Sequence, residues 1–379
     1  MKVALVAGET SGDLLAGLLL DGLKARWPDL RSFGIGGARM RERGFDAWWP
    51  SDKLAVRGYV EVLRHYREII GIRRQLRERL LQDPPDVFIG VDAPDFNLDL
   101  ARDLRAQGIK TIQFVSPSIW AWRGERIHKI KESVDHVLCI FPFEPALYAK
   151  HGISASYVGH PLANVIPIEV NRDKAREALN LAPDDVVVAV LPGSRASEIQ
   201  YIGETFAQTI KLMLRARPHI KVLLPAVPLL KQKIEAQLSV KLNEKYLAQV
   251  QVLAGQSHLA LAACDASLVA SGTATLEAAL FKRPMVIAYK MNPISWLMMR
   301  KRRYQAWVGL PNILCGDFVV PEFLQGAASP QALSRAVLAW LDDPAGSAKV
   351  AERFTALHHE LLRDTPRLCA QDVAKVLAA

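Results

Sequence analysis

Short apolar runs rich in β-branched residues alternate along the chain with longer stretches in which apolar residues recur every three or four positions. The first pattern is typical of buried strands, and the second is typical of amphipathic helices. Because the runs are almost continuously apolar and are separated by helical stretches, they predict parallel strands in βαβ units. The pattern therefore predicts an α/β fold.

The predicted strands form two series. The first series comprises residues 2–7, 31–35, 86–91, 110–115, 136–141 and 155–158, and the second comprises 186–191, 220–225, 250–253, 266–269 and 285–289. Between the two series, residues 159–183 carry three prolines, which is typical of a boundary. From residue 330 onward the pattern is wholly helical.

These series predict two Rossmann-like, doubly wound domains that face each other across a cleft. We expect an N-terminal domain over 1–165, a C-terminal domain over 166–345, and C-terminal helices over 346–379 that could pack back on the N-terminal domain. A chain of 379 residues is long enough for two cores. Ligands of open parallel sheets bind beyond the carboxyl ends of the strands, so the loops after the strands should carry the binding residues.

Composition narrows the class of partner. Lys and Arg outnumber Asp and Glu by 48 to 39, and the net charge of +9 favours an anionic partner: a nucleic acid, a nucleotide, a phosphorylated metabolite or an acidic membrane. The four cysteines lie far apart, which argues against a zinc site or a disulfide framework and suits a reducing cytoplasm. The chain has no recognised RNA-binding or DNA-binding motif and no apolar run long enough to predict a transmembrane helix.

The loop after the first strand reads GETSGD and comprises Gly8, Glu9, Thr10, Ser11, Gly12 and Asp13. Glycines permit a tight turn, and the polar residues can cap the following helix, whose free N–H groups suit an anion. A capped turn without a ligand is equally compatible with this pattern. The glycines from residue 34 do not complete a dinucleotide motif, because Arg39 stands where the third glycine is needed.

The stretch VDAPDFN, residues 91–97, places two acids directly after a buried strand. Asp92 could point toward a ligand as a general base, or either acid could cap the next helix. Asp95 lies closer to that helix, which leaves Asp92 as the candidate base.

A third loop, SPSIWAWR, follows the predicted strand 110–115. Its candidate binding residues are Ser116, Trp120, Trp122 and Arg123. Aromatic faces beside a guanidinium suit sugar rings or anionic groups, although packing tryptophans would give the same pattern.

Two loops in the second half suit a nucleotide. In LPGSR, Gly193 permits close approach of the backbone to a phosphate, and Ser194 and Arg195 can donate to a diphosphate. In SGTATLE, Ser271, Gly272 and Thr273 precede a helix, and Glu277 lies one turn further, where it could accept hydrogen bonds from ribose hydroxyls.

Taken together, VAGETSGD, VDAPDFN, SPSIWAWR, VGHP, LPGSR, SGTATLEAAL and GLPNIL resemble the lipid A disaccharide synthases, from residue 2 to the C-terminal helices. The resemblance implies a two-domain glycosyltransferase of the GT-B type without a metal or other cofactor. It implies an inverting reaction that joins UDP-2,3-diacylglucosamine to 2,3-diacylglucosamine 1-phosphate and releases UDP.

The resemblance also implies roles for the loops. Asp92 would take the proton from the acceptor hydroxyl, while residues 193–195 and 271–273 would stabilise the leaving UDP. Asn312 in GLPN would be a further donor contact. The loops 8–13 and 116–123 would lie on the acceptor side.

Lipid substrates would need an apolar and basic surface. Residues 57–81 predict a helix in which Val62, Tyr66, Ile69 and Ile70 are interleaved with arginines, which suits an anionic membrane. We therefore expect a cytoplasmic protein held peripherally at the inner face of the cytoplasmic membrane, and a homo-oligomer is compatible with the sequence. An ordinary helix with a solvated basic face would give the same pattern.

Two other classes share the nucleotide loops. Another GT-B enzyme or an epimerase that uses a UDP-sugar would need no membrane surface. A non-catalytic adaptor that binds nucleotide sugars and membranes would keep Arg195 and Glu277 but would not need Asp92.

Overall fold

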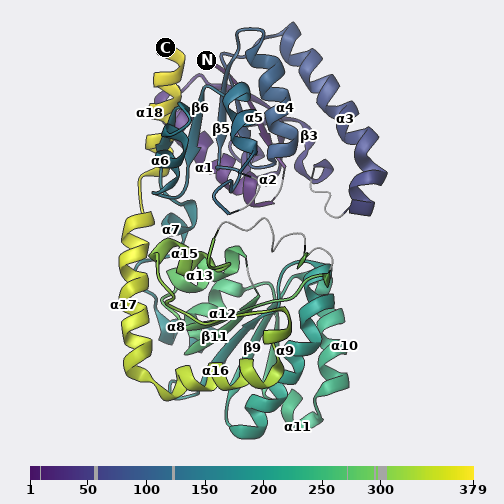
Figure 1. Cartoon of the computed structure of the whole chain (residues 1–379), viewed down its shortest axis with the longest axis vertical. Helices are drawn as coiled ribbons and strands as arrows, with labels where there is room; N and C mark the ends of the chain where they lie inside the picture. The colour runs from purple at the N-terminus through teal and green to yellow at the C-terminus, as the bar shows by residue number, and fades with distance from the viewer. Residues whose placement is uncertain (9, 55–58, 122–123, 271, 294–295, 298–304) are drawn as a thin grey trace. The chain divides into compact units, whose positions relative to one another are not determined.

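The computed structural model describes all residues except 9, 55–58, 122–123, 271, 294–295 and 298–304 (Figure 1). The described residues form two compact units. One comprises Met1–Asn164 and Glu360–Ala379, and the other comprises Val165–His359. The N-terminal unit is therefore discontinuous in the sequence, because its last helix comes from the end of the chain.

The N-terminal unit is built on a seven-stranded parallel sheet with the order β3-β2-β1-β4-β5-β6-β7. Its strands are β1 (Lys2–Ala7), β2 (Arg31–Gly36), β3 (Asp46–Pro50), β4 (Val87–Val91), β5 (Lys110–Phe114), β6 (His136–Cys139) and β7 (Ala155–Tyr157). The direction in which strands are added reverses between β1 and β4. That reversal is the topological switch point of a doubly wound sheet.

Helices connect these strands and cover the sheet. They are α1 (Thr10–Arg26), α2 (Ala38–Arg41), η1 (Ser51–Lys53), α3 (Tyr59–Gln82), α4 (Pro94–Arg105), α5 (Arg126–Ser133), α6 (Glu144–Ala149) and α7 (Pro161–Val165). Their apolar faces pack against the sheet: Leu76 and Leu80 of α3 and Leu100 of α4 join Phe88 of β4 in one buried core. Burial of these side chains is the main stabilising contribution to the unit.

The C-terminal helix completes the N-terminal unit. Figure 1 shows α18 (Thr365–Ala378) beside α1, and the two helices pack together. The approach requires a glycine, since a Cβ at Gly22 would lie 1.9 Å from the carbonyl oxygen of Pro366. The tyrosine hydroxyl of Tyr157 also donates to the carbonyl of Glu360 at 2.8 Å.

The C-terminal unit repeats the same topology. Its six-stranded parallel sheet has the order β10-β9-β8-β11-β12-β13, with the switch point between β8 and β11. The strands are β8 (Val187–Leu191), β9 (Lys221–Ala226), β10 (Val250–Ala254), β11 (Ala266–Ala270), β12 (Met285–Tyr289) and β13 (Glu322–Leu324). Both units therefore place their switch point between the first and fourth strands of the series.

The helices of the C-terminal unit cover its sheet around a second apolar core. They are α8 (Arg172–Ala178), α9 (Ala196–Ala216), η2 (Pro228–Leu230), α10 (Lys231–Lys241), α11 (Glu244–Leu247), α12 (Ser257–Ala263), α13 (Thr273–Leu280), α15 (Leu310–Cys315), η3 (Gln325–Ala327), α16 (Pro330–Asp342) and α17 (Pro344–Leu361). Among the helices of both units that the structure describes, none is long and apolar enough to cross a membrane.

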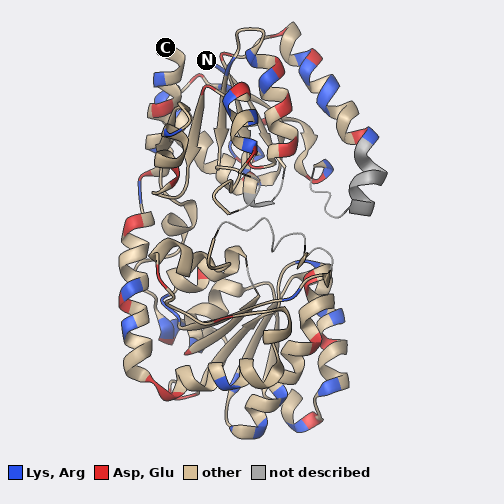
Figure 2. Cartoon of the chain, in the orientation of Figure 1, with Lys and Arg blue, Asp and Glu red and all other residues tan. Residues whose placement is uncertain are grey.

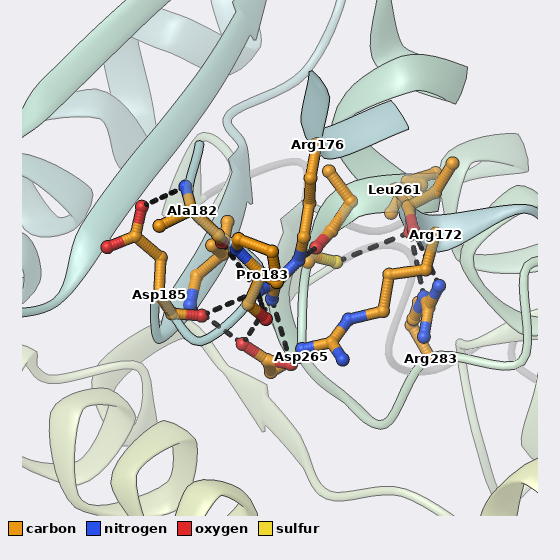
Figure 3. Close-up of polar contacts among 12 residues, drawn as sticks. Arg172, Arg176, Ala182, Pro183, Asp185, Leu261, Asp265 and Arg283 are labelled. Atoms are coloured by element: carbon orange, nitrogen blue, oxygen red, sulfur yellow. Dashed lines mark hydrogen bonds and ion pairs between the residues drawn. The ribbon is translucent and has the colours of Figure 1, made fainter. Parts of the chain in front are cut away.

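A buried arginine fastens α8 to the amino-terminal edge of the second sheet (Figure 3). The Arg176 side chain is 1% exposed and pairs with Asp265 at 3.0 Å. Asp265 also pairs with Arg172 and accepts from the backbone N–H of Val187 at 2.8 Å. The remaining guanidinium donors of Arg176 reach the carbonyls of Ala182, Pro183, Asp185 and Ala263. The buried guanidinium is therefore both ion-paired and hydrogen-bonded, as a buried charge must be to avoid a large desolvation penalty.

All eleven predicted strands are present, with bounds that differ from the predicted ones by at most two residues, and the predicted helices after residue 330 are confirmed. The strands β3 and β13 were not predicted. Both lie at sheet edges and are only partly buried or very short, so they lack the continuous apolar run that identifies a central strand.

Candidate active site

The switch point of the N-terminal sheet brings the first and third candidate motifs together. A Cβ at Gly8 would lie 2.7 Å from the Cβ of Ala93, and a Cβ at Gly12 would lie 3.7 Å from the Cβ of Asp92. The loop after β1 therefore lies directly against the loop after β4. Glu9 is outside the described residues, as are the side chains of Thr10 and Ser11.

Asp92 is partly exposed immediately beyond β4. Its backbone is left-handed, with φ of +55°, and so is that of Ala93, with φ of +41°. Each such residue other than glycine costs about 1–3 kcal/mol, and strain of this kind is concentrated at functional sites. Ala93 is the N-cap residue of α4, while Asp95 forms an ion pair with Arg126. Asp95 thus has a structural partner of its own, although it is not the cap.

Asp13 has a structural role rather than the predicted one on the acceptor side. Its buried carboxylate accepts from the backbone N–H groups of Gly37, Arg39 and Met40 at 2.8, 2.9 and 3.2 Å. It therefore neutralises the amino terminus of α2, which follows the glycines that resemble a dinucleotide motif. Since all three N–H groups are directed at Asp13, they favour a structural role for its carboxylate.

The loop after β5 is held from inside the unit. The hydroxyl of Ser116 is buried and lies 2.7 Å from the hydroxyl of Tyr148. The indole N–H of Trp120 donates to Glu144 at 2.9 Å, and its ring packs edge-on against Phe143. These contacts agree with the packing alternative for Ser116 and Trp120. Trp122 and Arg123 lie outside the described residues.

Glu144 is a buried acid that the sequence interpretation missed. It is 1% exposed, and burial raises its pKa to about 7, although hydrogen bonds from the backbone of Phe141 and from Trp120 act in the opposite direction. The nearby ring of Phe141 contacts His160, whose burial lowers its pKa to about 4. The loop with Trp120 is thus tied to an acid that titrates near neutral pH.

In the C-terminal unit, a carboxylate occupies the turn that was predicted to bind a diphosphate. Glu198 accepts from the backbone N–H groups of Ser194 and Arg195 at 2.9 and 3.2 Å, and its other oxygen lies 3.2 Å from the Arg195 guanidinium. A Cβ at Gly193, whose φ is +110°, would lie 2.4 Å from the same carboxylate. The turn therefore has the shape and donors for an anion, and Glu198 supplies one.

Tyr289, at the end of β12, belongs to the same neighbourhood. Burial raises the pKa of Tyr289, the charge of Glu198 raises it further, and the charge of Arg195 lowers it. In the sheet, the strand β12 that carries Tyr289 lies two places from β8. The sequence signal for it was its position at the carboxyl end of a predicted strand.

The second nucleotide loop starts α13 beside β11. Gly272 and Thr273 are exposed, Gly272 with φ of +132°, while Ser271 lies outside the described residues. Glu277 is largely buried, and burial raises its pKa. His258, at the start of α12, lies 3.7 Å from the Glu277 carboxylate. His258 was not predicted, although the turn Gly255–Gln256 before it marks a strand end.

Asn312, which was predicted as a donor contact, has a structural role in the chain. It is 0% exposed, and its amide nitrogen donates to Val320 and Glu322, both at 2.9 Å. Its oxygen accepts from the N–H groups of Val319 and Val320 at 2.9 and 3.0 Å. All four hydrogen-bonding positions of the amide are used within the chain.

The described part of α3 is basic, as Figure 2 shows, and two of its arginines form ion pairs within the unit. Arg73 and Arg77 form ion pairs with Asp99 and Asp103 of α4. Ile69 packs partly buried against the N-terminal core, which agrees with the alternative of an ordinary helix at that position. Ile70 is also partly buried, and the side chains of Val62 and Tyr66 lie outside the described residues.

Two doubly wound parallel sheets in one chain, with polar loops at both switch points, define the GT-B type of fold. Solved structures with this fold include the UDP-GlcNAc 2-epimerase from Neisseria meningitidis bound to UDP-GlcNAc, with a TM-score of 0.65, 12% identity and full coverage of both chains. Another is the glycotransferase of kitacinnamycin, with a TM-score of 0.64, 18% identity and 99% coverage of both chains. At these identities the likeness concerns the fold.

The family follows from closer relatives. A family model described as lipid-A-disaccharide synthetase matches residues 3–373. Lipid-A-disaccharide synthases from Albidiferax ferrireducens and Verminephrobacter eiseniae are 63% and 58% identical, covering all of this chain and 97% and 98% of their own. The chain belongs to the lipid-A-disaccharide synthetase family and is a glycosyltransferase, as the loop motifs predicted.

Proposed function

We propose that the chain joins UDP-2,3-diacylglucosamine to 2,3-diacylglucosamine 1-phosphate, giving lipid A disaccharide 1-phosphate and UDP. Membership of the family supports synthesis of the lipid A disaccharide. The observation that carries the finer proposal is the partly exposed carboxylate of Asp92 at the switch point of the N-terminal sheet. Ligands of this fold bind at such points, and a carboxylate there can serve as a general base.

In the proposed reaction, Asp92 accepts the proton of the acceptor's primary hydroxyl. The hydroxyl oxygen forms a bond to the anomeric carbon of the donor sugar as the bond from that carbon to the UDP oxygen breaks. A single displacement of this kind inverts the configuration at the anomeric carbon. Gly12 borders Asp92 and Gly8 borders the next residue, Ala93, which supports an acceptor site beside this loop.

The donor diphosphate is assigned to the switch point of the C-terminal sheet. The N–H groups of Ser194 and Arg195, the Arg195 guanidinium and the start of α13 at Gly272 and Thr273 supply fixed dipoles and charge for the leaving UDP. Glu277 is assigned to the ribose hydroxyls. In this proposal these groups stabilise the leaving group without a metal ion.

The reaction is tested by replacing the proposed base. Asp92→Asn should abolish formation of disaccharide and UDP, measured by mass spectrometry, while UDP affinity measured by calorimetry persists. Asp95→Asn makes the same charge change three residues away at an ion-paired position and should keep turnover. Near-normal turnover in Asp92→Asn would remove Asp92 from the base role. Full activity in EDTA is expected, and loss of activity in EDTA would refute a metal-free mechanism.

The proposal also includes peripheral binding to anionic membranes through the amino-terminal part of α3. The triple variant Val62→Ser, Tyr66→Ser and Ile70→Ser should sediment less with phosphatidylglycerol liposomes than the native chain. Leu229→Ser, at a 94% exposed apolar residue of the other unit, is the matched control. Undiminished sedimentation of the triple variant would count against α3 as the membrane surface.

A further inference from the structure

Two buried amides converge on the backbone of Asp92. Its carbonyl oxygen accepts from the side-chain nitrogen of Asn97 at 2.8 Å and from that of Gln113 at 3.1 Å. Asn97 comes from α4 and is 0% exposed, while Gln113 comes from β5 and is 1% exposed. One carbonyl thus receives hydrogen bonds from two different elements.

The side chain of Gln113 also contacts the backbone at the end of its own strand, β5. Its side-chain nitrogen lies 3.2 Å from the carbonyl of Phe114 and 3.3 Å from that of Val115. Val115 has a φ of +72°, which is an outlier for a β-branched residue. The left-handed turns after β4 and β5 are therefore both held by the same amide.

The strand beneath the amides is shaped to admit them. Gly90 pairs with Gln113 in the sheet. A Cβ at Gly90 would lie 2.7 Å from the Cβ of Asn97 and 3.0 Å from the Gln113 oxygen. A glycine inside a buried strand weakens that strand, and close approach of another group is the usual reason for it.

The amide of Asn97 is unfavourable as packing alone. Among the described residues, the buried oxygen of Asn97 has no hydrogen-bond partner, which carries a desolvation penalty that a leucine would avoid. The gain that offsets this penalty is the bond from Asn97 to the Asp92 carbonyl. That bond holds Asp92 in a backbone conformation that residues other than glycine rarely adopt.

We propose that Asn97 and Gln113 are positioning residues that hold the strained backbone of Asp92 and thereby aim its carboxylate for the transfer reaction. The inference rests on the base role proposed above for Asp92. The two amides contact the backbone of Asp92, and no contact with the substrate is assigned to them. Misplacement of a reacting group by about 1 Å can cost about 100-fold in rate.

The test uses Asn97→Leu and Gln113→Met, which keep side-chain size and remove the donor. Thr111→Val is the matched control: Thr111 lies on β5 two residues before Gln113, is 0% exposed and donates to the carbonyl of Ser133 at 3.0 Å. Turnover, KM, UDP affinity and thermal unfolding are measured for the full chain and all three variants, with turnover followed as a function of pH.

Asn97→Leu and Gln113→Met should each lower kcat by about 100-fold, with UDP affinity within about twofold of native. The acid limb of their pH profile should also shift, because the surroundings of the Asp92 carboxylate change. Thr111→Val should lose as much thermal stability as the two amide variants but keep its kcat within about threefold of the native value. If one variant does not fold, the other decides.

A kcat within about threefold of native in the folded variants would overturn the positioning role. So would an equal loss of kcat in Thr111→Val, since any buried polar replacement would then have the same effect. Asp92→Asn in the same series separates the two proposals. If Asp92→Asn is inactive and the amide variants are normal, only the positioning role fails; if Asp92→Asn is active, the base role fails.

Discussion

The buried acid Glu144 predicts a specific dependence of stability on pH. Its pKa is about 7 in the folded chain against a usual value of 4.5, so the folded state retains a proton that the unfolded state releases between these pH values. The free energy of unfolding must therefore fall as pH rises from about 4.5 to about 7. The difference between the two pKa values corresponds to about 3 kcal/mol, since one pKa unit is worth about 1.4 kcal/mol.

His160 acts in the opposite direction over nearly the same range. Its pKa is about 4 in the folded chain against a usual 6.5, so here the unfolded state binds the proton and stability rises with pH. The two contributions offset each other between about pH 4.5 and 6.5. The native chain should therefore show little net slope from this pair, and each single variant should expose the slope of the other.

Glu144→Gln removes the first contribution and keeps the size of the side chain. Relative to the native chain, its free energy of unfolding should increase by about 3 kcal/mol between pH 4.5 and 7.5. Urea unfolding at a series of pH values, followed by tryptophan fluorescence, measures this difference. A difference that is independent of pH would show that Glu144 does not carry the proton, and a difference of the opposite sign would refute its burial as the cause.

Three further predictions concern the C-terminal unit. Arg176→Met should lower the free energy of unfolding by about 3 kcal/mol in urea titrations, because four backbone carbonyls lose their donor and Asp265 loses one of its ion-pair partners; an unchanged midpoint would contradict this. Glu198→Gln should tighten UDP binding about fivefold in calorimetry, because the Glu198 carboxylate no longer competes with the diphosphate for the turn, a competition of about 1 kcal/mol. Glu204→Gln on the same helix should leave the affinity unchanged. Unchanged affinity in both variants would place the diphosphate elsewhere. Asn312→Ala should lower thermal stability and leave UDP affinity within about twofold, and a large loss of affinity at unchanged stability would restore it as a contact.

The fold could be predicted because each strand and loop is recognisable from a short stretch of its own sequence. Central strands need continuous apolar runs, and the loops after them identify themselves by glycine and polar residues, as in the runs that became β1, β4, β8 and β11. The edge strand β3 could not be predicted in this way, because DAWWP is only partly buried and ends in a proline.

The site was predictable only in outline. Position after a strand identified Asp92 and the turn at Gly193, but the use of each side chain depends on partners that are distant in the sequence. The carboxylate of Asp13 accepts hydrogen bonds from the start of α2. The amide of Asn312 forms its hydrogen bonds with residues 319–322. Glu144 was missed since a single acid in an aromatic stretch gives no signal of its own burial.

The placement of α18 constrains how the polypeptide reaches its native state. The unit that begins at Met1 is finished only by Glu360–Ala379, so the other unit is in effect inserted within it. During synthesis the first sheet can form early, but the face of α1 that packs against α18 stays uncovered until residues 365–378 have been made. Loss of the last twenty residues should therefore expose apolar surface in the part of the protein that was made first.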